Sequence, residues 1–289
     1  MRRAAPHLHG RQRGVALLLV LWACTLLAIL LGGYAALART EGLQARYQFA
    51  QTQAHYAAEA GLMRAAYALQ DPQAKQRWMA DGRVYTFHYD NATITVRAID
   101  EGGKVDLNAA SPEVLLALFQ VAGLKPAPAQ ALVDHVVDWR SLPAVEGDDA
   151  SARAGYLAAG RNYGPRHGPF ASVEELQMVL GVTPSLYRLL APAMTIWSGS
   201  SSPDPNTAPP LALAAIPGMT PEQRQQIEAA RQQNAKDPQL VLGSGTTHSI
   251  RSEATLADGT RAVLRATIRL QAGQAQPYAV LRWQEGEAE

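Results

Sequence analysis

The hydrophobic positions at the start of the chain form one long run. Residues 15–38 carry no charge, and four arginines precede them. A bilayer core about 30 Å thick requires about 20 helical residues, so this run is long enough to span a membrane. Because positive charges favour the cytoplasmic side, the pattern predicts a cytoplasmic N-terminus and an exported remainder.

A helical pattern continues beyond the apolar run. Residues 38–70 contain no proline and are rich in good helix formers. Small and apolar residues recur there every three or four positions and form one stripe. These residues are Tyr47, Ala50, Ala54, Ala57, Ala58, Gly61, Leu62, Ala65 and Leu69. We expect Asp71-Pro72 to end a single helix of roughly 55 residues, half in lipid and half packed on a soluble domain.

The pattern then changes to the alternation that is typical of strands. Residues 83–90 and 92–100 are joined at Asn91, which predicts a hairpin. A turn and a short extended stretch follow at 101–108, and helical signals run from Ala109 to about Lys236. Strands return at 247–256, 260–271 and 277–283, with a turn at Asp258-Gly259 between the first two. Either one sheet is interrupted by a helical insertion, or the chain has three independent domains. Two or three strands alone make a poor sheet, which favours the insertion.

The helical segment contains an internal repeat. One nine-residue pattern occurs three times, at residues 118–126, 176–184 and 213–221. It consists of Leu, any two residues, Val or Ile, any one residue, Gly, an apolar residue, Lys or Thr, and Pro. Its glycines, Gly123, Gly181 and Gly218, fit the left-handed position that closes a helix, and each following proline fits the first turn of the next helix. Thr183 and Thr220 are expected N-caps, and 172–175 and 220–223 match the capping box.

Composition and charge exclude several classes of function. The 289 residues have a net charge of +1, which implies no overall attraction to nucleic acid or anionic lipid. The single cysteine, Cys24, lies in the apolar run and excludes an intramolecular disulfide. The seven histidines are scattered without metal-ligand spacing, and no nucleophile elbow is present. We therefore expect no catalytic residue.

One loop carries candidate metal ligands. Asp138, Glu146, Asp148 and Asp149 cluster within 138–156. Calcium prefers six to eight oxygens from a flexible loop, so this segment is either a calcium site or a solvated acidic loop. The glycine- and proline-rich residues 160–170 are either a rigid linker or a partner surface, and we favour the linker.

Whether the apolar run is cut off or retained decides the class of protein. It is a secretory signal cut after Ala38, a plain signal anchor, or a pilin-type segment whose leader is cut just after Gly14. The unbroken helical pattern beyond residue 38 favours the last interpretation.

Several motifs together resemble those of a known protein family. The segment "RQRGVALLLVLW" (11–22) followed by "YAAEAGLMRAAYAL" (56–69) resembles minor pseudopilins, in particular the general secretion pathway protein K family of type II secretion systems. The resemblance extends over "KVDLNAASPEVL", "ALVDHVVDWR", "GPFASVEELQMVLGV" and "DPNTAPPLALAAIPGM". One departure is the Arg-Ser-Leu-Pro that follows Trp139, where the family usually has a denser acidic run.

The resemblance implies how the N-terminus is processed. Prepilin peptidase would cut between Gly14 and Val15, and Val15 would be N-methylated. Most pilins carry a glutamate at the fifth mature position, which is Leu19 here; its absence is typical of the K family. A subunit at the tip has no neighbour beyond it for that carboxylate to pair with.

The resemblance also implies the domain organisation, and the fold class is α+β. A pilin-like long N-terminal helix would pack on an antiparallel sheet, with a large all-α insertion of helix-hairpin-helix, or SAM-like, units. The expected parts are a leader (1–14), the transmembrane half of the helix (15–38), its periplasmic half with the first strands (39–107), the inserted helical domain (108–239) and the remaining strands (240–289).

The implied function is that of a minor pseudopilin at the tip of the type II secretion pseudopilus, where it initiates assembly for export of folded proteins. The protein would be a single-pass inner-membrane protein with a periplasmic globular domain. Its partners would be I- and J-type minor pseudopilins, mostly along the stripe from Leu17 to Leu69, with prepilin peptidase and the inner-membrane assembly platform. The alternative is a membrane-anchored helix-hairpin-helix module that binds DNA or protein. Only Lys125 and Arg224 lie near the hairpins, which argues against nucleic acid.

Overall fold

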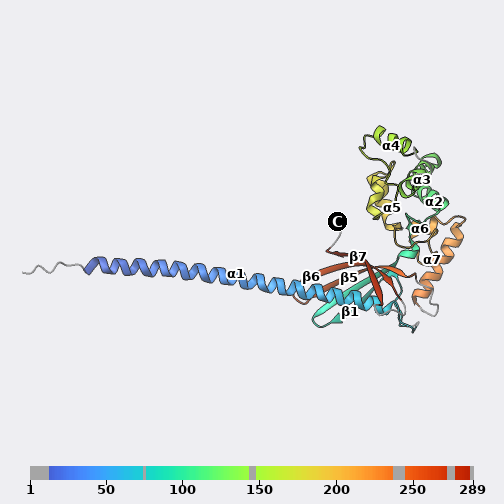
Figure 1. The fold of residues 1–289 in the computed structure, drawn as a ribbon. Helices are drawn as coiled ribbons and strands as arrows, with labels where there is room; N and C mark the ends of the chain where they lie inside the picture. The colour runs from blue at the N-terminus through green and yellow to red at the C-terminus, as the bar shows by residue number, and fades with distance from the viewer. Residues whose placement is uncertain (1–12, 74–75, 143–147, 237–244, 272–276, 287–289) are drawn as a thin grey trace, which may run out of the picture. The chain divides into compact units, whose positions relative to one another are not determined.

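The computed structural model describes residues 13–73, 76–142, 148–236, 245–271 and 277–286. The chain divides into two compact units, residues 1–53 and 54–289. Helix α1 (Arg13–Ala68) is a single helix of 56 residues that belongs to both units (Figure 1). This confirms the expected helix of roughly 55 residues, which ends three residues before Asp71.

The second unit contains a five-stranded antiparallel sheet in the order β1-β2-β5-β6-β7. The strands are β1 (Asp81–Tyr89), β2 (Ala92–Asp100), β5 (Thr247–Leu256), β6 (Arg261–Leu270) and β7 (Tyr278–Glu285). Strand β2 pairs with β5 along its whole length, from Ala92 opposite Leu256 to Asp100 opposite His248. The helical segment is therefore inserted between two neighbouring strands, and the expected α+β class is confirmed.

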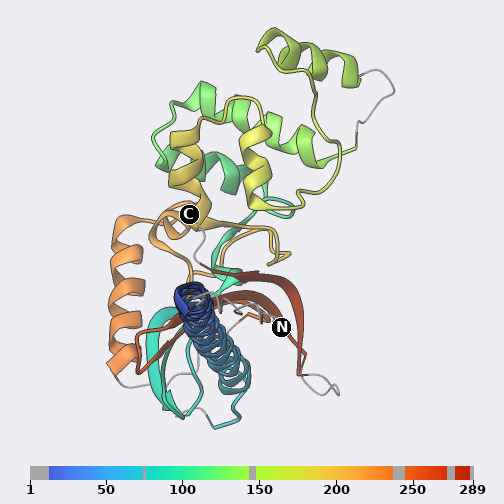
Figure 2. The same cartoon turned by 90° about the vertical axis from the view of Figure 1, so that its left-hand side faces the viewer.

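The end of α1 packs on one face of this sheet. The sheet curves around the helix in Figure 2, with Ala54, Ala58, Leu62 and Ala65 fully buried beneath it. Gly61 makes the closest approach, because a Cβ there would lie 2.6 Å from Cγ2 of Ile94. A larger residue would separate the helix from the sheet, so glycine is required at this contact.

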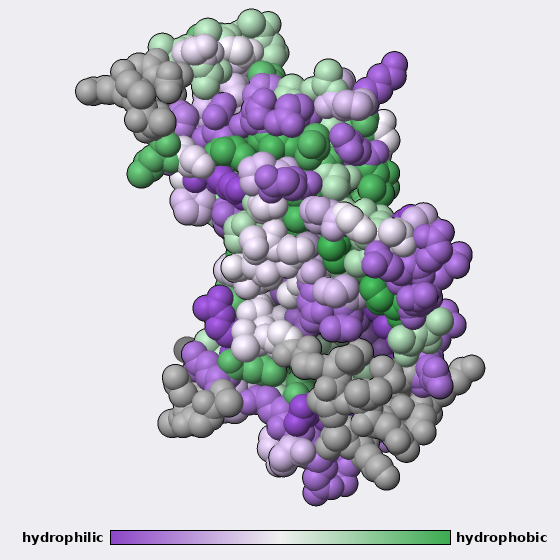
Figure 3. All heavy atoms as spheres, turned by 90° about the vertical axis from the view of Figure 1, so that its right-hand side faces the viewer, coloured by the Kyte–Doolittle hydropathy of each residue, from purple (hydrophilic) through white to green (hydrophobic). Residues whose placement is uncertain are grey.

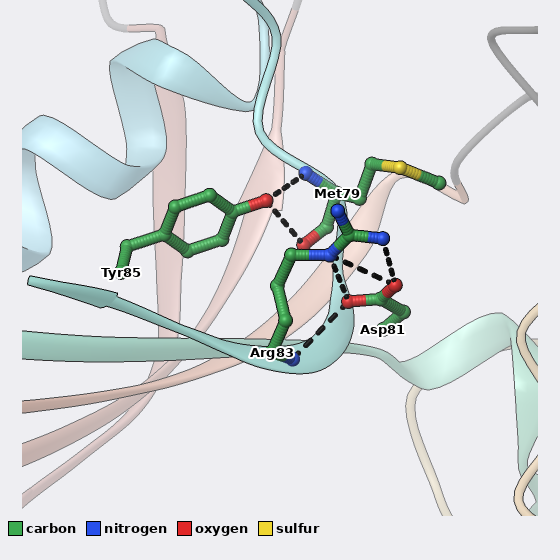
Figure 4. A network of polar contacts seen from close by, with 4 residues as sticks. All are labelled: Met79, Asp81, Arg83 and Tyr85. Carbon is green, nitrogen blue, oxygen red and sulfur yellow. Dashed lines mark hydrogen bonds and ion pairs between the residues drawn. The ribbon is translucent and has the colours of Figure 1, made fainter. Parts of the chain in front are cut away.

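A compact polar network fixes the connection between α1 and β1 (Figure 4). The backbone N–H of Trp78 donates to the carbonyl of Ala68 at 3.0 Å, and its ring stacks on Tyr85 with 4.1 Å between centroids. The Tyr85 hydroxyl accepts a hydrogen bond from Met79 N at 2.7 Å. Arg83 binds the Asp81 carboxylate through two nitrogens at 2.6–3.0 Å. Burial raises the pKa of Tyr85, so its hydroxyl stays protonated at neutral pH.

The inserted segment is built mainly from short helices. They are α2 (Pro112–Val121), α3 (Pro126–Arg140), α4 (Asp148–Ala158), α5 (Pro184–Leu190), α6 (Pro210–Ala214) and α7 (Pro221–Lys236), with 3-10 turns η1 (Glu101–Gly103), η2 (Val173–Met178) and η3 (Ala191–Ala193). Phe119, Trp139, Tyr156 and Leu176 are buried in a shared core of this segment. The segment thus has its own hydrophobic core, distinct from the contact between α1 and the sheet.

Two details of the insertion differ from the sequence expectation. The helical signals run through Met194–Thr195, yet these residues form strand β4, which pairs in parallel with β3 (Val105–Asp106). Two residues are too few for a strand to show its alternation in the sequence. The first element of the second repeat is the 3-10 helix η2 rather than an α-helix.

The predicted caps form in two places and fail in one. Thr183 Oγ1 accepts from Leu186 N at 3.2 Å. Thr220 and Gln223 form the reciprocal capping box, with distances of 2.9 and 3.2 Å. The capping box expected at 172–175 is wrong, because Ser172 makes no side-chain cap. Glu175 instead binds donors from other parts of the insertion.

Candidate functional site

The first unit exposes an apolar helix surface. Large hydrophobic side chains from Val15 onward are more than half exposed at almost every turn, including Leu21, Ile29 and Leu37 at 55, 70 and 57 %. Within the described residues, α1 is the helix that is long and apolar enough to cross a membrane. In residues 13–53, the described part of this unit, no other element covers these side chains, so lipid or other helices are the environments that suit them.

The residues expected to mark processing lie at the start of α1. Gly14 and Val15 are within its first turn, and the Val15 side chain is 65 % exposed. Leu19 follows one turn later and is 66 % exposed. The helix therefore presents an uncharged side chain at the position where the resemblance predicts the usual pilin glutamate to be missing.

The stripe expected to contact partners is partly covered by the protein's own sheet. Ala54, Ala58, Leu62 and Leu69 are buried against it, so the expectation that partners bind along 54–69 of this stripe is wrong. Periodicity identifies a face that is buried, but it does not reveal what covers it.

The opposite side of α1 in the second unit exposes another apolar set. Tyr56, Met63 and Tyr67 are 64, 44 and 76 % exposed. Their spacings of seven and four residues place them on one face of the helix. The Tyr278 hydroxyl of β7 contacts Sδ of Met63 at 2.7 Å, which fixes the edge of this surface. The same three-and-four spacing, applied to the aromatic residues, could have identified this face from the sequence.

The three repeat glycines lie at the turns between consecutive elements. Gly123, Gly181 and Gly218 have φ values of 97, 91 and 76°, in the left-handed region that favours glycine. A Cβ at Gly123 or Gly218 would meet no heavy atom within 4 Å. Backbone conformation rather than crowding therefore explains the glycine at these two positions.

A buried carboxylate holds the entry and exit of the insertion together. Asp106 of β3 is 1 % exposed and accepts hydrogen bonds from four donors. Oδ1 accepts from the N–H groups of Asn108 and Ala109 at 2.8 and 3.2 Å. Oδ2 accepts from Ser198 Oγ at 3.1 Å and from Gly199 N at 2.8 Å. This carboxylate thus joins the chain before α2 to the chain after β4.

A second carboxylate organises the middle of the insertion. Glu175 accepts from Trp139 Nε1 at 3.1 Å, from Arg166 Nη1 at 2.8 Å and from Ala171 N at 2.7 Å. Burial alone would raise the pKa of Glu175, but the bonds from Arg166, Ala171 and Trp139 outweigh it and hold the pKa below its ordinary value. Residues 160–170, expected to be a linker, are therefore tied to η2 through Arg166.

The candidate calcium ligands are only partly within the described residues. Asp138 lies in α3, and Asp148 and Asp149 begin α4. The side chains of Glu146, Asp148 and Asp149 lie outside the described residues. In the parts that the structure describes, no group of three or more His, Cys, Asp or Glu could hold a metal ion. The calcium site stays a prediction.

A hollow of about 570 Å³ adjoins Asp138 and is lined by His135, Tyr156 and His167. Nδ1 of His135 lies 3.0 Å from the Leu180 carbonyl, and Nδ1 of His167 lies 3.2 Å from the Ser141 carbonyl. Both rings are thus oriented by the backbone.

Figure 3 shows hydrophilic residues spread over one face of this unit, with smaller hydrophobic groups between them.

Comparison with known proteins finds similarity to one family. The family described as "Type II secretion system (T2SS), protein K" matches residues 93–199, from β2 into the helical insertion. The type II secretion system protein K of Klebsiella pneumoniae is 29 % identical over 251 residues, which cover 77 % of this chain and 74 % of that protein. These matches support a type II secretion minor pseudopilin of the protein K family. Its N-terminal apolar helix fits a membrane anchor, as the sequence predicts.

A solved structure supports the fold of this chain. The crystal structure of the GspK–GspI–GspJ complex from the type 2 secretion system of enterotoxigenic Escherichia coli contains a similar chain, with a TM-score of 0.57. The match covers 86 % of the present chain and 100 % of that chain, at 18 % identity. At this identity the likeness establishes the fold alone.

Proposed function

We propose that this protein K family member is a minor pseudopilin at the tip of the type II secretion pseudopilus, where it initiates assembly for the export of folded proteins. One observation carries the proposal. Helix α1 runs without a break from an exposed apolar segment into a helix that packs on the soluble sheet. A discarded signal would have no reason to continue as a structural part of the soluble unit.

The tip position is supported by Leu19 and by the insertion. In a filament, a carboxylate at that position can neutralise the N-terminal amine of a neighbouring subunit in lipid, where an unpaired charge is costly. Leu19 cannot do so. The insertion between β2 and β5 adds a separate helical core to one side of the pilin sheet, and this bulk opposes close packing of subunits above it.

The proposed partners are minor pseudopilins of the I and J types, with which the similar Escherichia coli chain was crystallised. The exposed apolar length of α1 would bundle with their helices in the inner membrane. On the periplasmic side, the face formed by Tyr56, Met63 and Tyr67 would continue the contact. Aromatic side chains with a polar tip suit an interface that is dry at its centre and wet at its rim.

Site-specific photo-crosslinking tests this proposal. A photo-reactive amino acid at position 67 or 56 should crosslink to an I- or J-type pseudopilin when the proteins are produced together. The same amino acid at Leu157 of α4, which is 55 % exposed, is the matched control and should give little product. Equal crosslinking from both places, or none from α1, would contradict the proposal.

A further inference from the structure

One face of the sheet carries a row of arginines. Val96 and Ser252 pair across β2 and β5 and face Gly61 of α1. Their chain neighbours Arg97 and Arg251 therefore stand on the opposite face, because side chains alternate along a strand. Arg97 lies directly opposite Arg251, and Arg251 lies directly opposite Arg265 of β6. Three arginine side chains thus leave the same face of the sheet at neighbouring positions on three strands.

The next row on this face adds a fourth arginine. Ser249 pairs with Thr267, and their hydroxyl oxygens are 3.1 Å apart. Thr267 pairs with Arg282 of β7. The two rows line a groove of about 360 Å³, which includes Arg97, Arg251, Arg265, Arg282, Ser249, Thr267 and Gln284. Among the residues that the structure describes, no carboxylate lines this arginine groove.

The positive charge of the groove is only partly balanced. Arg251 binds Glu253 at 2.8 Å, and Arg282 binds Glu174 of η2 at 3.1 Å. Within the described part of the chain, Arg97 and Arg265 make no ion pair. Like charges placed directly opposite each other on a sheet destabilise it. A row of three arginines is therefore a cost to folding that a bound anion would relieve.

We propose that the arginine groove binds an acidic segment of a partner protein through its Asp or Glu carboxylates. A guanidinium presents a planar fork of donors that matches a carboxylate in two parallel hydrogen bonds. The two arginines that already have counter-ions hold carboxylates, from Glu253 and Glu174. Ser249, Thr267 and Gln284 supply neutral hydrogen-bonding groups between them. A groove of this size accepts a few side chains rather than a planar lipid surface.

Binding of a model acidic peptide tests the inference. The full chain in neutral-detergent micelles is titrated into a fluorescent peptide of alternating Glu and Ser, and anisotropy is measured. The same peptide with Gln in place of Glu is the ligand control. We expect only the Glu peptide to bind, with affinity falling as salt rises. The double variant Arg97→Gln/Arg265→Gln should weaken binding by about tenfold or more.

Matched variants separate this site from general charge effects. Lys125→Gln/Arg188→Gln removes the same charge from exposed positions at the N-cap of α3 and in α5, and it should change affinity by less than about twofold. Equal losses in both double variants, or no binding of the Glu peptide, would overturn the inference. Displacement of the peptide by phosphatidylglycerol vesicles, but not by phosphatidylcholine vesicles, would also overturn it in favour of lipid.

A second double variant tests the proposal if the first one does not fold. If circular dichroism shows that Arg97→Gln/Arg265→Gln is unfolded, Arg97→Lys/Arg265→Lys keeps both charges but removes the guanidinium forks. Its affinity for the Glu peptide should fall measurably. An unchanged affinity would show that the forks do not hold carboxylates and would refute the proposal.

Discussion

Gly61 of α1 lies directly against Ser252 of β5, so closely that position 61 has no room for a side chain. A Cβ at that position would meet Ser252 Oγ and lie 2.6 Å from Cγ2 of Ile94 and 3.3 Å from Cγ2 of Val96. This contact sets how near the helix approaches the sheet. The attachment of α1 to the soluble unit therefore depends on the absence of one methyl group.

Gly61→Ala should lower the free energy of unfolding of the soluble unit by about 1–3 kcal/mol, because overpacking outweighs the gain in helix propensity. Urea unfolding followed by circular dichroism measures the change. Gly42→Ala is the matched control in the same helix, since a Cβ there meets no atom within 4 Å. It should be neutral or slightly stabilising. Adding Ser252→Ala to Gly61→Ala should restore part of the loss, and a purely additive result would contradict the contact.

Asp106→Ala should destabilise the insertion by about 1–3 kcal/mol, because it removes the buried acceptor of the N–H groups of Asn108 and Gly199 and of the Ser198 hydroxyl. Asp134→Ala, at an exposed position of α3, should change stability by less than about 0.5 kcal/mol. Thermal unfolding measures both. Equal effects of the two substitutions would show that Asp106 does not join the ends of the insertion.

The network around Glu175 should make stability depend on pH in the acid range. Its folded pKa lies below the ordinary value of 4.5, so ionisation favours the folded state. The stabilisation is complete above pH 4.5 and is lost as the pH falls through the lower folded pKa. Glu175→Gln should remove this part of the dependence. Urea midpoints across the acid range, with Glu228→Gln as control, measure it; an unchanged pH profile in Glu175→Gln would contradict the network.

The elements with strong local signals could be predicted from the sequence. Strand β5 has the expected ends, 247 and 256, because its alternating pattern and the Asp-Gly turn that follows define it locally. Helix α1 was equally clear, since 56 residues without a proline share one helical pattern. The repeat glycines have the positive φ values that their position before a helix start suggested.

Features that depend on distant contacts could not be predicted. The β3–β4 pair joins residues on either side of the insertion's core, and neither strand has a pattern of its own. The row of Arg97, Arg251 and Arg265 exists only through the register of β2, β5 and β6. Glu175 looked like part of a capping box, but Arg166 and Trp139, which are distant in sequence, determine its partners.

The tip position makes a prediction for assembled filaments. In cells that overproduce pseudopili, gold-labelled antibodies against the insertion should mark one end of each filament, because Leu19 and the insertion both oppose addition of a subunit above this one. Antibodies against a major pseudopilin should mark the whole length in the same preparation. Labelling along the shaft by the first antibody would contradict the tip position.

The most direct test of the account is the intact mass and N-terminal sequence of the protein produced with and without prepilin peptidase. We expect a chain that begins at N-methylated Val15 only when the peptidase is present, with α1 otherwise retained. A chain that begins at Arg39 would show a discarded signal peptide, and an uncut chain would show a plain anchor. Either result would contradict the assignment of this protein as a pseudopilin.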